Sequence, residues 1–378
     1  MSPGTGLSKI YLLSCPRPSD PHFRANQYSK LKSKVQNVIF NPPQILPLAV
    51  SGQRPFWSVM IPTYNARADY LEETLRSILD QAPGLEQMQI EVVDDCSPNG
   101  APLELVRRIA GDRVAVHCEP KNNGLAGIWN RCIERARGEW IHILHQDDII
   151  LPGFYEKLRA GIAAAPDVGM AYCRFALMDG GGHWKELGPI ERLAPGVLEG
   201  WLERVTTGYH VECPAVVVRR RTYEDLGGFT SALRFALDLE MWVRIAVHFP
   251  VYYHPQILAC YRRHGANETS VQQQTGRDMM DVARALQLWK QYLPPHVAER
   301  LFAAGSQFWA ETAVVLAQKF YSENKMDACS AQLKASEVLW NQGTTRKRRL
   351  KLAAKVKIHR IFGTSLITAL RNLRRRLR

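Results

Sequence analysis

Hydrophobic and polar positions alternate along the chain in blocks that predict strands followed by helices. The run WSVMIPTYN is apolar until it reaches polar residues, which is typical of a buried strand that ends in a loop. In the block ADYLEETLRSILDQ, one face of a predicted helix carries Leu71, Leu75, Ile78 and Leu79. The same alternation continues to residue 148, and it predicts a mainly parallel sheet with helices on both faces.

These patterns divide the chain into four regions. Residues 1–54 are rich in Pro, Ser, Gln and Asn and show little periodicity, so we expect a loosely structured extension. Residues 55–271 carry the strand–helix alternation, and residues 272–345 carry apolar residues at helical spacing. The aromatic stripe of this helical region is interpreted as core between helices, with a partner-binding stack of helical hairpins as the alternative. Residues 346–378 form a basic tail.

The charge of the chain is concentrated in that tail. The formal net charge is +13, from 49 Lys or Arg and 36 Asp or Glu. Residues 346–378 contain 13 Lys or Arg and no Asp or Glu, so the rest of the chain has 36 basic residues against 36 acidic ones. A neutral body argues against nucleic-acid binding, and no nucleic-acid partner is expected.

The tail itself has the pattern of a cationic amphipathic helix. Its apolar stripe is formed by Leu366, Leu370, Leu373 and Leu377. Such a helix can lie on an anionic membrane surface, to which each nearby basic residue adds on the order of 1 kcal/mol. A solvated, disordered tail is the alternative. Contact with RNA or DNA is disfavoured, because aromatic residues that stack on bases are scarce there.

Other features favour a cytoplasmic protein. The eight cysteines are scattered and form no CxxC pair, which argues against a zinc knuckle or a disulfide framework and suits a reducing compartment. The N-terminal apolar piece is too short for a signal peptide, and no run approaches the roughly 18 apolar residues of a spanning helix. We therefore expect a cytoplasmic location, or a peripheral one at the inner face of the membrane.

Three strand ends deliver polar side chains to one edge of the predicted sheet: Thr63, Tyr64 and Asn65 after the first, Asp94 and Asp95 after the second, and Asp147 and Asp148 after the fourth. One acidic pair could simply cap a turn or a helix. Two pairs on one edge need a shared counter-charge, and a divalent cation held with substrate phosphates would supply it. A dinucleotide-binding site is disfavoured, because the first turn, IPTYNA, lacks the GxGxxG fingerprint.

Six stretches of the chain together resemble a known family. They are SVMIPTYN, VVDDCSPNG, NNGLAGIWN, LHQDD, GGFTSALRFALDLEMWVRIA and YRRHGANETS. In this order and approximate spacing they resemble the family 2 glycosyltransferases of the GT-A fold, over about residues 56–270. The resemblance implies a Rossmann-like α/β domain of the GT-A type, followed here by a C-terminal helical region. It also implies transfer, with inversion, of a sugar from a nucleotide-diphospho-sugar to a hydroxyl acceptor, in cell-surface polysaccharide or glycolipid synthesis.

The resemblance assigns roles to residues at the strand ends. Thr63, Tyr64 and Asp95 would hold the nucleotide base, and Asp94 would support their loop. The other residues expected to contact the donor are Pro62, Asn65, Asn123, Gly124, His145, Gln146, Asp147 and Arg262.

A divalent cation, Mg²⁺ or Mn²⁺, is the cofactor that the resemblance implies. Asp147 takes the place of the last Asp of the family's DxD motif, which binds the metal on the donor diphosphate, and His264 can reach the metal. His145 stands at the first acidic position of that motif and departs from it, although a His there can bond a ribose hydroxyl or a phosphate. Asp148 either supports the metal site or caps the following turn.

Transfer also needs a base that deprotonates the acceptor hydroxyl. The stretch RFALDLEMWVRIA offers Asp238 and Glu240, which should point about 200° apart on a helix. Asp238 matches the catalytic Asp of the family's ED motif, in which Leu237 replaces the Glu, and we expect it to be the base. Glu240 is expected to be structural or to face the acceptor. A carboxylate that only starts a helix is the alternative for Asp238.

The expected partners are a UDP- or dTDP-linked sugar donor and a glycan or lipid-linked acceptor. Two other hypotheses remain open on the sequence. The departures at His145 and Leu237 allow a non-catalytic relative that binds a sugar nucleotide or a glycan. The helical region allows a scaffold protein that recruits partners.

Overall fold

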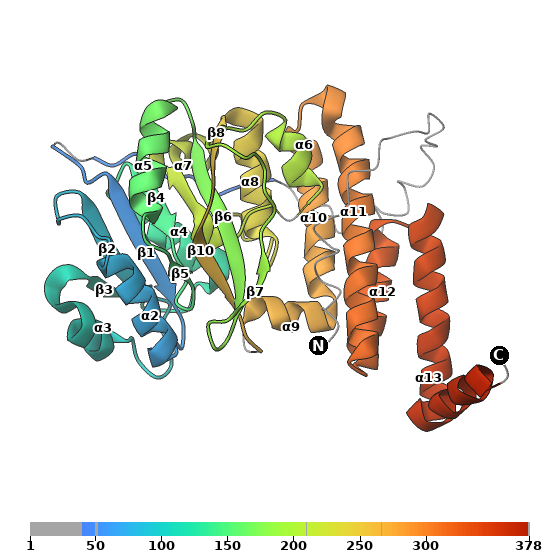
Figure 1. The fold of residues 1–378 in the computed structure, drawn as a ribbon. Helices are drawn as coiled ribbons and strands as arrows, with labels where there is room; N and C mark the ends of the chain where they lie inside the picture. The colour runs from blue at the N-terminus through green and yellow to red at the C-terminus, as the bar shows by residue number, and fades with distance from the viewer. Residues whose placement is uncertain (1–39, 50–51, 209, 266, 377–378) are drawn as a thin grey trace.

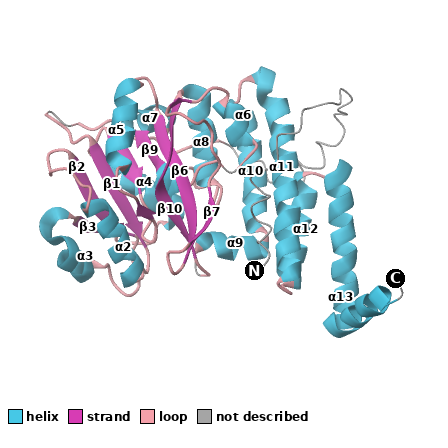
Figure 2. Cartoon of the chain, viewed as in Figure 1, coloured by secondary structure: helices cyan, strands magenta, loops and turns pink. Residues whose placement is uncertain are grey.

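The computed structural model describes residues 40–49, 52–208, 210–265 and 267–376, with side chains up to Ile361. Figures 1 and 2 show a sheet with helices on both of its faces and, beside it, a group of long helices formed by the last part of the chain. The fold class expected from the sequence, an α/β domain followed by a helical region, is confirmed.

Within the described residues, ten strands belong to one sheet. Its main path runs in the order β3-β2-β1-β4-β9-β6-β10-β5, and β7 pairs with β6 and β8 with β10. The strands are β1 (Trp57–Thr63), β2 (Met88–Asp94), β3 (Ala115–Cys118), β4 (Trp140–Ile143), β5 (Ile149–Ile150), β6 (Met170–Asp179), β7 (Trp184–Leu187), β8 (Gly196–Val197), β9 (Val216–Arg219) and β10 (Val251–Arg263).

The first half of the sheet has the expected parallel pairing. β1 is parallel to β2 and to β4, and β2 is parallel to β3. Helices alternate with these strands along the chain: α2 (Ala68–Leu79), α3 (Leu103–Ala110), α4 (Gly124–Arg135) and α5 (Phe154–Ala164). α2, α3 and α5 bury their apolar residues against one face of the sheet, and α4 buries its own against the other. Strands with apolar residues on both faces are thereby covered on both sides.

The second half of the sheet is mixed. β9 lies between β4 and β6 and runs antiparallel to both, whereas β10 is parallel to β6. The connection from β6 to β9 contains β7, β8 and α6 (Trp201–Thr206), and it begins and ends at the same edge of the sheet. β9 therefore enters in the opposite direction, and the residues just before it lie beside the end of β4.

Two helices after β9 cover the same face as α4. They are α7 (Arg220–Leu226) and α8 (Leu237–His248), and their buried residues belong to one hydrophobic core with those of the C-terminal helices. The C-terminal helices are α9 (Glu268–Thr275), α10 (Arg277–Tyr292), α11 (Pro295–Ser322), α12 (Met326–Leu339) and α13 (Gly343–Arg376). Trp289 and Trp309 are fully buried, in agreement with the interpretation of the aromatic stripe as core.

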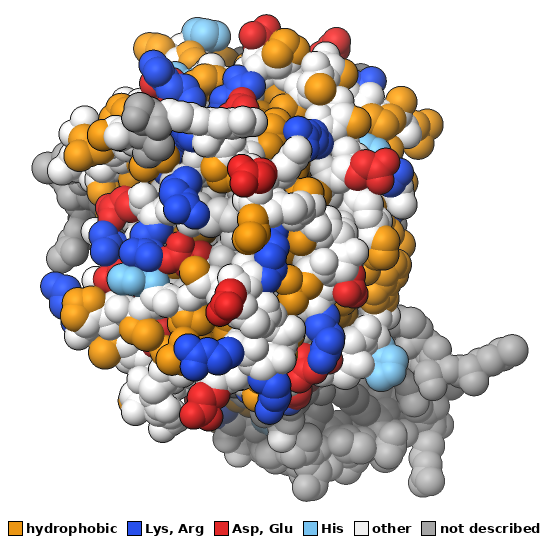
Figure 3. Space-filling model, turned by 90° about the vertical axis from the view of Figure 1, so that its left-hand side faces the viewer, with side chains coloured by type: hydrophobic (Ala, Val, Ile, Leu, Met, Phe, Trp, Pro, Cys, Tyr) orange, Lys and Arg blue, Asp and Glu red, His pale blue; other side chains and the backbone are white. Residues whose placement is uncertain are grey.

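None of the described helices has the length and apolar character of a membrane span. The basic tail continues as helix α13, and Leu352 and Val356 in its first part are buried against the helical region. The leucine stripe expected at 366–377 lies outside the residues whose side chains are described, so membrane contact stays a prediction. On the face shown in Figure 3, acidic and basic side chains are interspersed, in keeping with the balanced charge of the body.

The described part of the expected N-terminal extension contains no helix or strand, yet it lies against the body. Ile45 is 1% exposed within the main core. The Phe40 N–H donates to Gln291 Oε1 on α10 at 3.0 Å, and the Gly228 N–H donates to the Pro43 carbonyl at 2.8 Å. Residues 40–49 therefore connect the helical region to the loop before α8.

Candidate active site

The carboxyl ends of the parallel strands meet at one edge of the sheet. β1 and β2 end level with each other, because Thr63 pairs with Asp94. In β4, Ile143 pairs with Met60, so the chain leaves this strand at the same edge, close to the end of β1. The polar residues that follow the three strands are thus brought together, as the alternation of strands and helices predicted.

Asp94 organises the loop after β2. Its Oδ1 accepts hydrogen bonds from the Thr63 hydroxyl at 2.9 Å and the Ser97 hydroxyl at 2.7 Å, and its Oδ2 accepts one from the Ser97 N–H at 2.8 Å. The residue is 1% exposed. With three donors on a buried carboxylate, Asp94 supports the two loops that follow β1 and β2, and the Thr63 hydroxyl is engaged in that support.

Asp95 caps helix α4. Its Oδ1 accepts from the Asn123 N–H at 2.7 Å and the Asn123 side-chain amide at 3.0 Å, and its Oδ2 accepts from the Gly124 N–H at 3.0 Å. Gly124 has φ +70°, a conformation that a residue without Cβ adopts at no steric cost. The helix N-terminus is therefore satisfied by a carboxylate from the neighbouring strand end, which is the capping role that an acidic pair after a strand can play.

Gln146 connects the loops after β1 and β4. Its side-chain amide accepts from the Tyr64 N–H at 2.9 Å and donates to the Tyr64 carbonyl at 3.3 Å. The Tyr64 side chain is 47% exposed, so its ring is open to contact a planar ligand. The next residue, Asn65, has φ +48° and donates its N–H to the Ser97 hydroxyl. Pro62 is a buried residue within β1.

Asp147 and His264 face each other. Asp147 Oδ2 lies 2.9 Å from His264 Nε2, and both side chains are partly exposed, at 18% and 16%. The structure therefore brings together, across 117 positions of sequence, the two residues expected to bind a metal. No group of three or more metal-binding side chains forms among the described residues. A cation held here would thus need oxygen atoms from a ligand or water as well.

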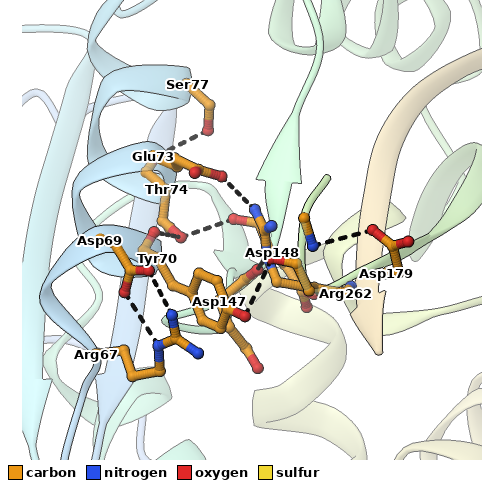
Figure 4. Close-up of polar contacts among 12 residues, drawn as sticks. Arg67, Asp69, Tyr70, Glu73, Thr74, Ser77, Asp147, Asp148, Asp179 and Arg262 are labelled. Atoms are coloured by element: carbon orange, nitrogen blue, oxygen red, sulfur yellow. Dashed lines mark hydrogen bonds and ion pairs between the residues drawn. The ribbon is translucent and has the colours of Figure 1, made fainter. Parts of the chain in front are cut away.

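Arg262 is buried between α2 and the loop after β4. Its guanidinium donates to the Asp147 carbonyl at 2.7 Å, forms an ion pair with Glu73, and lies 4.5 Å from the centre of the Tyr70 ring. Figure 4 shows it between Glu73 on one side and Asp147 with Asp148 on the other. The guanidinium is therefore bound to protein groups, and its visible role is to join the end of β10 to α2.

Asp148 and His145 form a buried acid–base pair. Asp148 Oδ2 lies 3.3 Å from His145 Nδ1, and Asp148 Oδ1 accepts from the Arg262 N–H at 2.8 Å. Burial would lower the pKa of His145, but the hydrogen bond and the charge of Asp148 raise it above its ordinary value. The His145 ring stacks on Trp129 at 5.0 Å between centroids. Asp148 thus favours the protonated form of the imidazole at the first position of the DxD-like motif.

Asp238 lies in the first turn of α8. Its Oδ1 accepts from the Leu239 N–H at 2.7 Å, and withdrawal from water raises the pKa of Asp238 to about 6. The charge of His145 opposes this rise. The cavity on the helical side of Asp238 has a volume of about 20 Å³, which suits a single water molecule rather than a sugar.

Glu240 was expected either to be structural or to face the acceptor, and its contacts are those of a structural residue. It is fully buried and forms a two-point ion pair with Arg244, at 3.0 and 2.8 Å, and Oε1 also accepts from the Tyr292 hydroxyl at 3.0 Å. Arg244 in turn donates to the carbonyl groups of Leu226 and Gly228. The pair fastens α8 to the loop before it and to α10.

Asp281 on α10 holds the loop that leads into α8. Its Oδ2 accepts three backbone N–H groups, from Arg234 at 2.8 Å, Phe235 at 2.7 Å and Ala236 at 3.0 Å. The Asp281 side chain is buried, and its Oδ1 bonds Arg284 at 3.0 Å. No local sequence pattern indicates this role, because Asp281 lies about 45 residues from its partners and belongs to an ordinary helical pattern.

Comparisons with known proteins agree with this architecture. Residues 58–227 match the family described as glycosyl transferase family 2. An uncharacterized protein of Mycobacterium tuberculosis is 31% identical over 258 residues, which cover 63% of this chain and 77% of that protein. A putative teichuronic acid biosynthesis glycosyltransferase of Bacillus subtilis is 40% identical over 102 residues, 26% of this chain and 38% of that protein.

A solved structure extends the likeness to the fold. The mannosyltransferase of Pyrobaculum calidifontis in complex with GDP-Man and Mn²⁺ has a TM-score of 0.50 and 18% identity, over 90% of this chain and 94% of its own. At that identity the likeness concerns the fold alone. The compared residues make up most of this chain, so they extend beyond the sheet domain into the C-terminal helices.

Proposed function

This chain belongs to glycosyl transferase family 2, and we propose that it transfers a sugar from a nucleoside diphosphate to a hydroxyl group of a glycan or lipid-linked acceptor, with inversion at the anomeric carbon. The observation that carries the proposal is the arrangement at one sheet edge. The facing pair Asp147 and His264 follows β4 and β10, and Asp238 begins α8. Asp147 and His264 can thus act on the leaving diphosphate, and Asp238 can act as the base for the acceptor.

In the reaction that we propose, the acceptor oxygen forms a bond to the anomeric carbon while the bond from that carbon to the diphosphate oxygen breaks. The electron pair of the broken bond stays on the diphosphate, and the acceptor proton passes to Asp238. A carboxylate with a pKa of about 6 is ionised at pH 7 and still basic enough to take that proton. One base and no second nucleophile correspond to a single displacement, which inverts the anomeric carbon.

The residues present fit the divalent cation that the family implies. Asp147 supplies a carboxylate oxygen and His264 an imidazole nitrogen, 2.9 Å apart and partly exposed. Mg²⁺ in such sites is bound by one or two protein groups plus substrate phosphates, and Mn²⁺ accepts the same oxygens as well as an imidazole. When bound, the metal supplies Lewis-acid stabilisation of the departing diphosphate. The Mn²⁺ and GDP-Man of the mannosyltransferase structure support this assignment.

The donor base is proposed to lie over the loops after β1 and β2. The exposed ring of Tyr64 is available to stack on the base. Hydrogen bonds made by Thr63, Asp94, Asp95 and Gln146 hold the loops in place. We propose a UDP- or dTDP-linked sugar as the donor. The setting that we propose is synthesis of a cell-surface polysaccharide or glycolipid, with the teichuronic acid relative as support.

The first test is a screen of UDP-glucose, UDP-N-acetylglucosamine, dTDP-rhamnose and GDP-mannose, each with Mn²⁺ or Mg²⁺. We expect one of them to raise the unfolding temperature in a metal-dependent way and to be hydrolysed slowly without acceptor. Asp147→Ala should lose the metal-dependent shift, and Asp238→Asn should keep it but lose hydrolysis. Asp327→Ala, at a fully exposed site on α12, is the matched control. Binding without hydrolysis by the unchanged chain would instead support a non-catalytic relative.

A further inference from the structure

Glu212 lies at the same sheet edge and has no role so far. It precedes the short 3-10 turn Cys213–Ala215, which leads into β9. Because β9 runs antiparallel to β4, with Val218 opposite Ile141, the residues before β9 lie beside the end of β4. His142 on β4 hydrogen-bonds the Pro214 carbonyl at 3.0 Å and holds the turn against that strand. The direction of β9 thus brings Glu212 to the proposed active site.

The Glu212 side chain is buried but only partly satisfied. It is 7% exposed, and Oε1 finds no hydrogen-bond partner among the described residues. The other buried glutamate of this region, Glu240, is bonded by both Arg244 and Tyr292. A buried carboxyl group kept for the fold alone is normally satisfied in that way, because the desolvation cost of an unpaired oxygen is large. Oε1 of Glu212 therefore has hydrogen-bonding capacity that the described residues do not use.

Charges from both sides of the site act on Glu212. Burial raises the pKa of Glu212 to about 8; Arg263 and His145 oppose the shift, and Asp238 and Asp148 add to it. The carboxyl group is therefore mostly protonated at pH 7 and has an O–H to donate. Asp148 and His145 belong to the side of Asp147, where the diphosphate is proposed, and Asp238 is the proposed base. A donor sugar must lie between these two sides, and the register of β9 against β4 puts Glu212 beside the end of β4 at the same edge.

We propose that Glu212, as a neutral carboxylic acid, donates a hydrogen bond to a hydroxyl group of the sugar that is transferred. This inference rests on the proposed function and deepens it, because it names a residue that recognises the sugar rather than the nucleotide. A neutral donor has a physical advantage at this place, since a second anion beside Asp238 would make that base harder to keep ionised.

The test compares two ligands that differ only in the sugar. Calorimetry with Mn²⁺ gives the affinity of the nucleotide sugar that the unchanged chain hydrolyses, taken from the four screened above, and of the matching nucleoside diphosphate. Glu212→Leu should weaken the nucleotide sugar by about 10- to 100-fold and leave the diphosphate unaffected. Glu212→Gln should lose less, because its amide still donates a hydrogen bond. Glu240→Gln, at another buried glutamate, is the matched control and should not separate the two ligands.

A pH series provides a readout that a structural role would not change. As pH rises through about 8, Glu212 loses its proton and the affinity for the nucleotide sugar should fall relative to the diphosphate, whereas Glu212→Gln should show no such fall. If Glu212→Leu does not fold, this comparison decides alone. Equal sugar discrimination in the unchanged chain and in Glu212→Gln at pH 7 and pH 9 would overturn the inference. If the unchanged chain binds no nucleotide sugar at all, that result refutes the proposed function itself, whatever the Glu212 variants do.

Discussion

Replacing Asp281 by alanine tests whether the helical region supports the proposed base. The change removes the single acceptor of three backbone N–H groups in the loop before α8. The Ala236 N–H is buried, and an unsatisfied buried donor costs about 1–3 kcal/mol. The Arg234 and Phe235 N–H groups are partly buried and can recruit water, so we assign each about 0.5–1 kcal/mol. The free energy of unfolding should therefore fall by about 2–5 kcal/mol.

Urea unfolding at pH 7, extrapolated linearly to water, measures this loss. Asp327→Ala on α12 is the control, because it also removes an aspartate that pairs with an arginine, but at the surface. It should not change the free energy of unfolding measurably. Hydrolysis of the nucleotide sugar should fall in Asp281→Ala even at temperatures where the variant is fully folded, since Asp238 follows the released loop by two residues. A loss of stability below about 1 kcal/mol, or equal to that of Asp327→Ala, would refute the reasoning.

Three further predictions concern pH and the tail. The pKa of Asp238 is raised to about 6, so turnover should drop as pH falls below 6 and the base is protonated. Because the ionised form is disfavoured in the folded state, Asp238→Asn should raise the free energy of unfolding at pH 7.5 but not at pH 4, where the side chain is protonated; an equal gain at both would contradict this cause. A chain ending at Ile361 keeps the buried Leu352 and Val356, and it should bind anionic vesicles less than the full chain in a sedimentation assay. Equal sedimentation would exclude the tail as a membrane contact.

The first half of the fold could be predicted because local sequence patterns indicate each of its elements. Strand and helix patterns identify the elements from β1 to β4, and the right-handed connection of parallel strands then places their ends at one edge. The approach of Thr63 to Asp94, and the position of Asp147 beyond β4, follow from that topology. The family resemblance added the expectation that His264, from the far end of the domain, can reach the metal that Asp147 binds.

The remaining features depend on long-range direction and contact, which no local pattern contains. The run of valines in β9 does not indicate whether this strand is parallel or antiparallel to its neighbours. Its antiparallel direction, and with it the position of Glu212, could therefore not be predicted. The contact between Asp281 and the loop before α8 has no local signal either. Two expected donor-binding side chains, Asp95 and Arg262, turn out to be bonded to protein groups, because a helix N-terminus and the Glu73 carboxylate lie within their reach.

The burial of Arg262 has a consequence for how much the site must rearrange when a ligand binds. Its backbone N–H, guanidinium and aromatic contact attach the end of β10 to Asp148, Glu73 and Tyr70 at once. His264 follows two residues later and so starts from a fixed position rather than from a freely moving loop. Placing the imidazole opposite Asp147 costs conformational entropy, and much of this cost arises when the chain folds. The same cost therefore does not weaken the later binding of an anionic ligand.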